Sequence, residues 1–266
     1  MKNIYFLVLL AGIIAISACE NRTAISKKEV NNDNLLIATL YHQKSAERDA
    51  LCLQAYNMAK YRLDDILAEN PDSSKLAIVL DLDETVLDNS PYEAKCILRN
   101  ISYPTGWDEW MHAACAKELP GAVEFLEYVK SKGVSIFYIT NRKEKYKNAT
   151  MQNLQKLGIA PVSEAHLLLR TDESSKEPRR QKVLEGHKII MLFGDNLADF
   201  TKVFDGKKSV NERLELVISL KDEFGDRFIV FPNTMYGDWL NAVIDHNFNL
   251  SPAAKIEKQK NELQGF

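Results

Sequence analysis

Apolar residues recur along the chain in two patterns, as short continuous runs and as longer stretches at helical spacing. The short runs are bounded by turn residues, which is typical of strands buried on both faces. They occupy residues 76–80, 134–139, 166–169, 189–193 and 228–231. Amphipathic stretches lie between them, among them residues 122–132 and 147–157. This alternation predicts an α/β fold whose parallel sheet is covered by helices on both faces.

A helical pattern also precedes the first strand. It runs from about Leu35 to Leu67 and ends at Asn70-Pro71, where proline cannot continue a helix. We expect one long amphipathic helix here. Its apolar positions are Leu51, Ala55, Met58, Ala59, Leu63, Ile66 and Leu67.

Residues 87–120 interrupt the alternation of strands and helices. They separate the first strand from the next helix and carry four large aromatic side chains, Tyr92, Tyr103, Trp107 and Trp110. We interpret them as an insertion, mostly helical or irregular, over the carboxyl ends of the strands. Open α/β sheets bind ligands at that edge, so the insertion is a candidate cap that selects the substrate.

The first residues resemble an export signal. Lys2 precedes an apolar run, residues 5–16, that is short for a membrane span, and the run ends in Ser17-Ala18-Cys19. Small residues before a cysteine resemble the lipobox of bacterial lipoproteins, in which the cysteine is acylated. We therefore expect a lipoprotein signal peptide at 1–18, lipidation of Cys19, a polar tether at 19–34 and a folded domain at 35–266. The alternative is a plain secretory peptide cut nearby, with Cys19 incidental.

Lipidation would anchor the chain in the bacterial cell envelope, and we expect the outer membrane. Composition adds little: 45% hydrophobic and 27% charged residues are ordinary for a soluble protein of 266 residues. The net charge of −3 gives no reason to expect a nucleic acid polymer as partner.

Three further cysteines remain, Cys52, Cys96 and Cys115. An odd number without CxxC spacing predicts neither a disulfide framework nor a zinc site. One pair could form, and the sequence does not choose it. A homodimer is also open, since an odd cysteine can link two chains.

Acidic residues follow two of the predicted strands. Asp81 and Asp83 come directly after the first strand, and residues two apart on an extended backbone point the same way. Their repulsion would be relieved by a hard divalent cation such as Mg²⁺. After the fourth strand, Gly194 allows a tight exit before Asp195 and Asp199. The alternative is a solvated strand end with scattered acids.

Donor groups follow the other strands. Thr140, Asn141 and Arg142 end the second strand and offer hydroxyl, amide and guanidinium groups to phosphate oxygens. Basic residues between 170 and 180 follow the third strand. Because the carboxyl ends of parallel strands share one edge, the acids and the donors can meet there, and a metal-bound phosphoryl group needs such positive charge.

Four motifs in this order resemble the haloacid dehalogenase (HAD) superfamily of phosphotransferases: DLDET (81–85), YITNR (138–142), a lysine, and GDNLADF (194–200). Longer stretches are similar to class C acid phosphatases, the bacterial lipoprotein subgroup with four signature aspartates. They are QAYNMAK (54–60), DLDETVLDNSPY (81–92), PGAVEF (120–125) and PNTMYGDW (232–239). The resemblance covers roughly residues 38–249. It implies a HAD-like Rossmannoid parallel sheet with a small helical cap after the first strand.

The resemblance implies an acid phosphatase mechanism. Asp81 would be the nucleophile, and Asp83 would protonate the leaving alcohol and then deprotonate water. Thr140 would hold a phosphoryl oxygen, and Lys176 would neutralise its charge. The choice of Lys176 rests on its place in the stretch Asp-Glu-Ser-Ser-Lys, since Arg170, Arg179 and Arg180 lie close by.

The resemblance also implies the metal ligands. Asp81, Asp195 and the backbone carbonyl of Asp83 would bind Mg²⁺, and Asp199 would orient ligands from nearby or through water. Glu84 and Asp88 receive no chemical role and are interpreted as local scaffolding.

Aromatic residues suggest the substrate. Trp107 and Tyr236 are predicted to face a nucleobase, together with Asn141 at the substrate, and Tyr92 and Asn89 could line the same pocket. Stacking suits a nucleoside monophosphate or an aryl phosphate. Any of these rings, like Trp110 and Trp239, could instead pack between insertion and sheet.

Three functions stay open at this point. The first is a Mg²⁺-dependent acid phosphatase with 5′-nucleotides among its substrates. The second is a HAD phosphatase for another phosphomonoester, such as a sugar phosphate. The third is a surface lipoprotein that binds a partner without catalysis.

Overall fold

The computed structural model describes residues 33–159 and 163–266. At its centre lies a five-stranded sheet in the order β5-β4-β1-β6-β7, and every neighbouring pair is parallel. The strands are β1 (Leu76–Leu80), β4 (Ser135–Lys143), β5 (Leu167–Arg170), β6 (Lys188–Gly194) and β7 (Phe228–Val230). The predicted α/β fold with a parallel sheet is confirmed.

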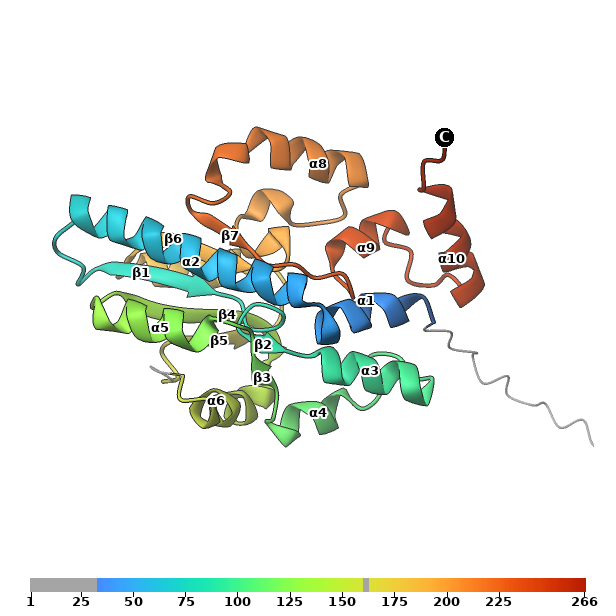
Figure 1. Ribbon diagram of the computed structural model, residues 1–266, viewed down its shortest axis with the longest axis horizontal. Helices are drawn as coiled ribbons and strands as arrows, with labels where there is room; N and C mark the ends of the chain where they lie inside the picture. The colour runs from blue at the N-terminus through green and yellow to red at the C-terminus, as the bar shows by residue number, and fades with distance from the viewer. Residues whose placement is uncertain (1–32, 160–162) are drawn as a thin grey trace, which may run out of the picture.

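Helices cover both faces of the sheet (Figure 1). Two helices, α2 (Ala46–Glu69) and α5 (Ala122–Ser131), pack on one face, and α7 (Glu177–Leu184) packs on the other. The remaining helices are α1 (Asp33–Lys44), α3 (Ser90–Arg99), α4 (Trp107–Ala113), α6 (Lys147–Lys156), α8 (Val210–Ser219), α9 (Asp238–Val243) and α10 (Pro252–Asn261).

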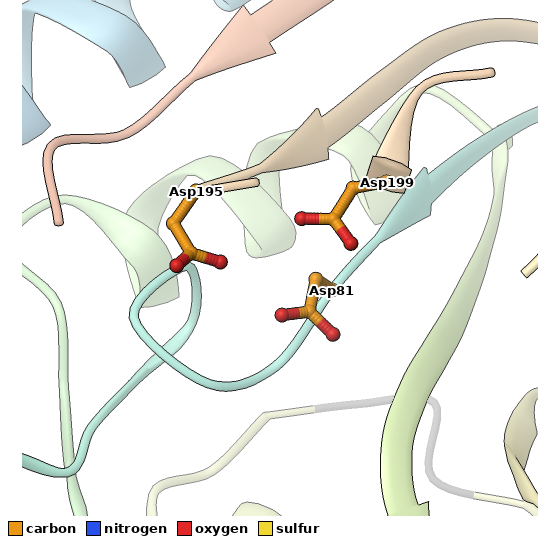
Figure 2. A group of neighbouring side chains, drawn as sticks. All are labelled: Asp81, Asp195 and Asp199. Carbon is orange, nitrogen blue, oxygen red and sulfur yellow. The ribbon is translucent and has the colours of Figure 1, made fainter. Parts of the chain in front are cut away.

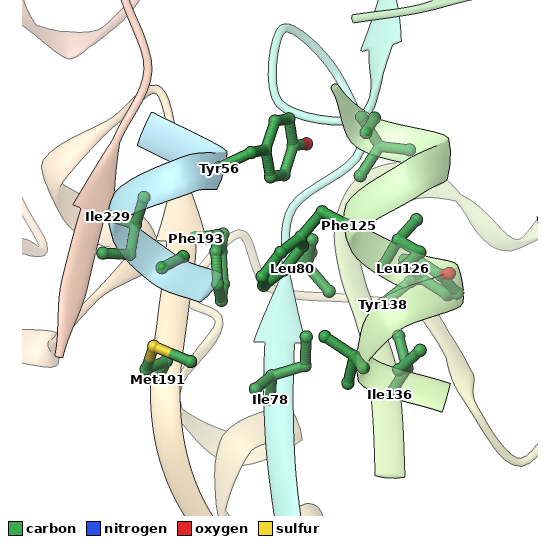
Figure 3. Packing of buried hydrophobic residues seen from close by; sticks show 14 of the residues in the cluster. Tyr56, Ile78, Leu80, Phe125, Leu126, Ile136, Tyr138, Met191, Phe193 and Ile229 are labelled. Carbon is green, nitrogen blue, oxygen red and sulfur yellow. The ribbon is translucent and has the colours of Figure 1, made fainter. Parts of the chain in front are cut away.

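The two-residue period of the strands distributes the core between the two faces. Ile78 and Leu80 of β1 belong to the larger apolar cluster with α2 and α5 (Figure 3), whereas Ala77 and Val79 belong to the cluster with α7. Because both faces are covered, all five residues of β1 are buried. Continuous burial on both faces explains why the strand reads as an unbroken apolar run.

A buried tyrosine connects this core to the loop after β1. Tyr56 of α2 packs against Phe125 of α5 with ring centroids 5.2 Å apart. Its hydroxyl donates a hydrogen bond to the carbonyl oxygen of Thr85 at 2.7 Å. The core therefore fixes the loop that carries the first acidic cluster.

The prediction of one long helix from Leu35 to Leu67 is wrong. The helix is interrupted at Ser45. The backbone of Ser45 is extended (φ −84°, ψ 121°), and its hydroxyl accepts a hydrogen bond from the N–H of Arg48 at 3.2 Å. Ser45 therefore caps a new helix, α2. Apolar positions continue on both sides of the break, so the helical period carries no sign of it.

The insertion leaves and rejoins the domain through a short stem. In this stem β2 (Leu87–Asp88) pairs antiparallel with β3 (Lys117–Glu118). Between the two strands lie α3 and α4, so the described part of residues 87–120 is mainly helical, with connecting loops.

Several predictions concern residues outside the described part of the chain. They are the signal peptide 1–18, the lipidation of Cys19 and most of the tether 19–34, whose last two residues, Asp33 and Asn34, belong to α1. Among the described residues, none of the helices combines the length and apolar character that crossing a membrane requires.

None of the three described cysteines is disulfide-bonded. Cys52 and Cys96 are buried and Cys115 is exposed. Burial raises the pKa of the Cys52 thiol to about 11, so this thiol stays protonated and behaves as a small apolar group.

Candidate active site

Asp81 and Asp83 directly follow β1. The N–H of Asp81 donates to the carbonyl oxygen of Phe193 at 2.9 Å, which ties the end of β1 to β6. Asp81 is buried, and its Oδ1 lies 2.5 Å from Lys176 Nζ. Burial raises the pKa of Asp81 to about 7, with the Asp199 and Asp83 carboxylates acting in the same direction against the attraction of Lys176.

The second pair of acids, Asp195 and Asp199, follows Gly194, the last residue of β6. Asp199 Oδ2 accepts a hydrogen bond from the N–H of Asn196 at 3.0 Å, which fixes the turn between Asp195 and Asp199. A Cβ atom on Gly194 would lie 2.4 Å from the Asp199 side chain. Close approach by Asp199 is therefore what requires glycine at this position.

Three carboxylates converge at this edge of the sheet. Oxygens of Asp81, Asp195 and Asp199 lie within 4.8 Å of one another, and Figure 2 shows the side chains turned toward a common space. Lys176 Nζ also lies 2.6 Å from Asp199 Oδ1. Burial raises the pKa of Asp195 well above its usual range, and the neighbouring Asp199 and Asp81 carboxylates add to the effect.

Lys176 keeps its charge in this group. Burial alone would lower its pKa, but the adjacent Asp199 and Asp81 carboxylates outweigh burial and hold the pKa above its ordinary value. The group therefore has three carboxylates around one ammonium ion, an excess of negative charge.

These residues fit a hard divalent cation. The donor set consists of carboxylate oxygens, which suit Mg²⁺, Ca²⁺ or Mn²⁺ rather than the softer sites built from cysteine or histidine. A cation among Asp81, Asp195 and Asp199 would balance their repulsion. Asp199 belongs to this group of carboxylates, and its predicted role of orienting ligands from nearby or through water stays a prediction.

The Asp83 side chain lies in a different environment. Its Oδ1 accepts hydrogen bonds from Arg142 Nη2 at 2.7 Å, Arg142 Nε at 2.9 Å and Asn89 Nδ2 at 2.7 Å. Arg142, expected among the phosphate donors, is therefore engaged with Asp83. A metal contact through the Asp83 carbonyl stays a prediction.

Glu84 and Asp88 hold the loop that connects β1 to the insertion. Glu84 is fully buried in a left-handed backbone conformation (φ 57°), and its Oε1 accepts the N–H of Asn89 at 2.8 Å. Asp88 Oδ1 accepts the N–H of Ser90 at 2.8 Å, at the start of α3. Both contacts agree with a scaffolding role.

The crowded basic residues after β5 divide into two groups. Among these basic residues in the described part of the chain, Lys176 alone lies at ion-pair distance from Asp81 and Asp199. Arg179 and Arg180 are bound to backbone oxygens, with Nη1 of Arg179 2.5 Å from the Thr140 carbonyl and Nη1 of Arg180 2.9 Å from that of Asp199. The two arginines thus secure the loops on either side of the site.

Thr140 and Asn141 lie near the end of β4, which pairs with β1. Thr140 is fully buried, and its hydroxyl accepts the N–H of Arg142 at 3.1 Å. A cavity lies over the carboxylates. Among the described residues, Asn141 lines this cavity and Thr140 does not. The predicted contact between Thr140 and a phosphoryl oxygen stays a prediction.

A cavity of about 610 Å³ opens over the carboxylates, large enough for a small organic phosphate. Trp107 and Tyr236 both line it, as does Tyr92. The Trp107 ring is held edge-on by Tyr92 at 4.8 Å and by Tyr103 at 5.8 Å between centroids. The predicted base-facing residues are thus brought to one cavity from the insertion and from the segment after β7.

Three other candidates lie outside the cavity wall. Asn89 is fully buried, and its Oδ1 accepts a hydrogen bond from Trp110 Nε1 at 2.8 Å. Trp239 Nε1 donates to the carbonyl oxygen of Asn233 at 3.1 Å. Trp110 therefore packs against the core and Trp239 is an exposed ring held by a hydrogen bond, and neither belongs to the cavity surface.

Several residues of the site were not identified from the sequence. Asn233 Nδ2 donates to Asp195 Oδ2 at 2.7 Å, and although Asn233 stands in the motif 232–239 its role was not apparent from the motif. Leu35 of α1 and Lys255 of α10 join the wall from the two ends of the described chain. Glu93 of α3 also lines it, and burial raises the pKa of Glu93 to about 7.

Comparison with known proteins identifies relatives. The model of the HAD superfamily, subfamily IIIB (acid phosphatase) matches residues 16–239. A class C acid phosphatase from Bacillus anthracis has 46% sequence identity and a TM-score of 0.84, with 88% of this chain and 98% of that chain covered. The same protein with tungstate bound gives a TM-score of 0.85 at equal identity and coverage.

Curated relatives are more distant. Acid phosphatase 1 of Solanum lycopersicum is 27% identical over 137 residues, 48% of this chain and 53% of its own length. Vegetative storage protein 2 of Arabidopsis thaliana is 26% identical over 189 residues, 68% of this chain and 67% of its own length. The chain thus matches about half the length of the tomato enzyme.

The raised pKa values of the Asp81 and Asp195 carboxyl groups predict how stabilisation by a divalent cation depends on pH. Without metal, the fold becomes less stable as pH rises from about 4 toward 7, because the folded state holds protons that the unfolded state has released. A cation must displace those protons at pH 5 but not at pH 8. We expect the rise in Tm caused by a fixed Mg²⁺ concentration to be larger at pH 8, as measured by calorimetry.

Asp195→Asn is the matched variant and should lose most of the pH-dependent part of this stabilisation. A Tm rise that is equal at both pH values, or larger at pH 5, would contradict the assignment of these carboxylates to the metal.

Proposed function

Since the chain belongs to the HAD superfamily, subfamily IIIB (acid phosphatase), we propose that it is a metal-dependent acid phosphatase acting through an aspartyl-phosphate on Asp81. The observation that carries this proposal is the position of the Asp81 carboxylate. It lies at the end of a buried strand, 2.5 Å from Lys176 and beside Asp195 and Asp199, under a cavity of about 610 Å³.

Membership of the family does not by itself fix activity, because relatives from Arabidopsis are named vegetative storage proteins. The local geometry favours catalysis. The two acids at the end of β1 are held by different cations, Asp81 by Lys176 and Asp83 by Arg142. Two carboxylates with different partners can take different roles.

In the first half-reaction an oxygen of the Asp81 carboxylate attacks phosphorus. The bond between phosphorus and the ester oxygen breaks, and its electron pair stays on that oxygen, which takes a proton from Asp83 and leaves as the alcohol. Lys176 and Asn141 would hold the phosphoryl oxygens, and their position in the cavity wall supports this role.

In the second half-reaction water attacks the phosphorus of the aspartyl-phosphate. The water gives a proton to Asp83, and the bond between phosphorus and Asp81 breaks, so that Asp81 returns as a carboxylate. A Mg²⁺ ion held by Asp81, Asp195 and Asp199 would supply charge screening between the nucleophile and the anionic ester.

The cavity wall supports a nucleoside monophosphate as one substrate. Trp107 and Tyr236 offer aromatic surfaces, and Lys143, Arg170 and Lys255 add positive charge around them. A sugar phosphate remains the second candidate, since hydroxyl-rich substrates would use the polar part of the same wall.

A lipid anchor at Cys19 belongs to the proposal and rests on the apolar run 5–16 and the small residues before the cysteine. It would hold the enzyme in the bacterial envelope, at the outer membrane. The mass of the N-terminal peptide from membrane-extracted protein would show it. A free amino terminus near residue 19 without acyl groups would exclude the anchor.

The nucleophile has a direct test. Asp81→Asn should reduce hydrolysis of p-nitrophenyl phosphate by at least about a thousandfold, because the amide cannot attack phosphorus. Phosphate release measures it. Asp72→Asn, an exposed carboxylate just before the same strand, is the matched control and should leave the rate unchanged. Undiminished release by Asp81→Asn would sink the proposed mechanism.

Substrate class is tested on Trp107. Replacing Trp107 with leucine should raise KM for AMP about tenfold, the loss of one stacking contact of about 1–3 kcal/mol. KM for glucose 6-phosphate should change little. If wild-type enzyme prefers the sugar phosphate, or if both KM values change alike, the nucleotide proposal is wrong.

A further inference from the structure

The insertion is connected to Asp83 through a chain of hydrogen bonds that does not pass through the cavity wall. It begins at Trp110 on α4, whose Nε1 donates to Asn89 Oδ1 at 2.8 Å. It continues from Asn89 Nδ2 to Asp83 Oδ1 at 2.7 Å. Asn89 is fully buried, and Trp110 packs against the main apolar cluster of the sheet.

The Trp110 N–H donor constrains the orientation of the Asn89 side-chain amide. An indole nitrogen can only donate, so it requires the amide oxygen of Asn89. The amide nitrogen must then point to the other side, where Asp83 accepts. With the amide reversed, two oxygens would face each other at Asp83, and the indole would lose its acceptor. Trp110 at 2.8 Å, with a longer contact of 3.5 Å from Arg142 Nη2 to the same oxygen, therefore favours the orientation in which Asn89 is a donor to Asp83.

Asn89 is also held from the backbone side. Its N–H donates to Glu84 Oε1 at 2.8 Å, and its Nδ2 lies 3.3 Å from Glu84 Oε2. Asn89 is the last residue before α3, so it stands where the loop after β1 enters the insertion. A single amide thus joins the catalytic loop, Glu84 and a helix of the insertion.

The two oxygens of Asp83 differ in what they contact. Oδ1 accepts three strong donors, two from Arg142 and one from Asn89. Oδ2 accepts one longer hydrogen bond, from Arg142 Nε at 3.3 Å. Among the described residues Oδ2 is therefore the less engaged oxygen, and it keeps capacity to carry a proton while Oδ1 is fixed.

We propose that Trp110 and Asn89 are positioning residues that orient Asp83 for proton transfer to the leaving oxygen. Through them the packing of α4 sets the geometry of the acid. This inference rests on the proposed function and adds to it a role for two residues that do not touch the substrate.

The leaving group provides the test. An alkoxide such as that of glucose 6-phosphate must be protonated as it departs, whereas p-nitrophenolate is stable as its anion and departs without a proton. The value of kcat/KM reports the half-reaction that ends with departure of the alcohol. Since glucose 6-phosphate has no base to stack on Trp107, the ratio of its kcat/KM to kcat/KM for p-nitrophenyl phosphate measures how well Asp83 acts as an acid.

Trp110→Phe keeps an aromatic ring at this position and removes the N–H donor. We expect this ratio to fall about tenfold, a fraction of the 10²–10⁴ that a well-placed acid contributes. Asn89→Ser should lower the ratio as well. In the double variant the two losses should be much less than additive, because both act on the same carboxylate.

Glu109→Gln is the matched control on the same helix. It removes the ion pair between Glu109 and Lys95, 2.7 Å long, which links α4 to α3 without reaching Asp83. It should leave the ratio unchanged. Thermal unfolding of each variant separates a loss of fold from a loss of positioning, and if Trp110→Phe does not fold, Asn89→Ser carries the measurement.

Two outcomes would overturn the inference while leaving the proposed function intact. One is an equal loss on glucose 6-phosphate and p-nitrophenyl phosphate, which indicates a general structural effect. The other is an unchanged ratio in folded Trp110→Phe and Asn89→Ser. If the unmodified chain releases phosphate from neither ester, the proposed function fails, and the inference fails with it.

Discussion

Repulsion among carboxylates at one edge of a parallel sheet is the constraint on which the site depends. Asp81, Asp195 and Asp199 are brought within 4.8 Å by strands that are paired for other reasons, namely burial of their apolar residues. Lys176 compensates part of the charge. The remainder makes this edge suited to a cation, since a protein core tolerates unbalanced charge only when it is protonated or coordinated.

The fold and the acidic cluster were predictable because they rest on local patterns. Buried runs such as 76–80 match β1 residue for residue, and an acid that follows such a run can only lie at the strand's carboxyl end. The break at Ser45 was not predictable, because the apolar period continues across it. Helix breaks set by a single cap leave no trace in hydrophobic spacing.

Which residues of the site contact one another was harder to predict than the edge of the sheet at which they lie. Arg142 ends the YITNR motif and was predicted as a phosphate donor, yet its Nη2 lies 2.7 Å from Asp83 Oδ1. Asn233, Leu35 and Lys255 reach the site from segments far apart in sequence. Such contacts depend on tertiary packing, which one sequence does not reveal, whereas the order of motifs along the chain does reveal the edge where they meet.

The contact between α1 and the segment after β7 has a consequence for folding. The His42 ring accepts the N–H of Thr234, a residue 192 positions later in the chain, and Thr234 lies between Asn233 and Tyr236 of the site. Likewise β1 at the centre of the sheet pairs with β6, more than a hundred residues downstream. Contacts of such high sequence separation form slowly, and here they require nearly the whole chain. The surroundings of Asp81 therefore cannot be complete before nearly the whole chain is present, so a chain still emerging during synthesis carries Asp81 without the neighbouring carboxylates and lysine.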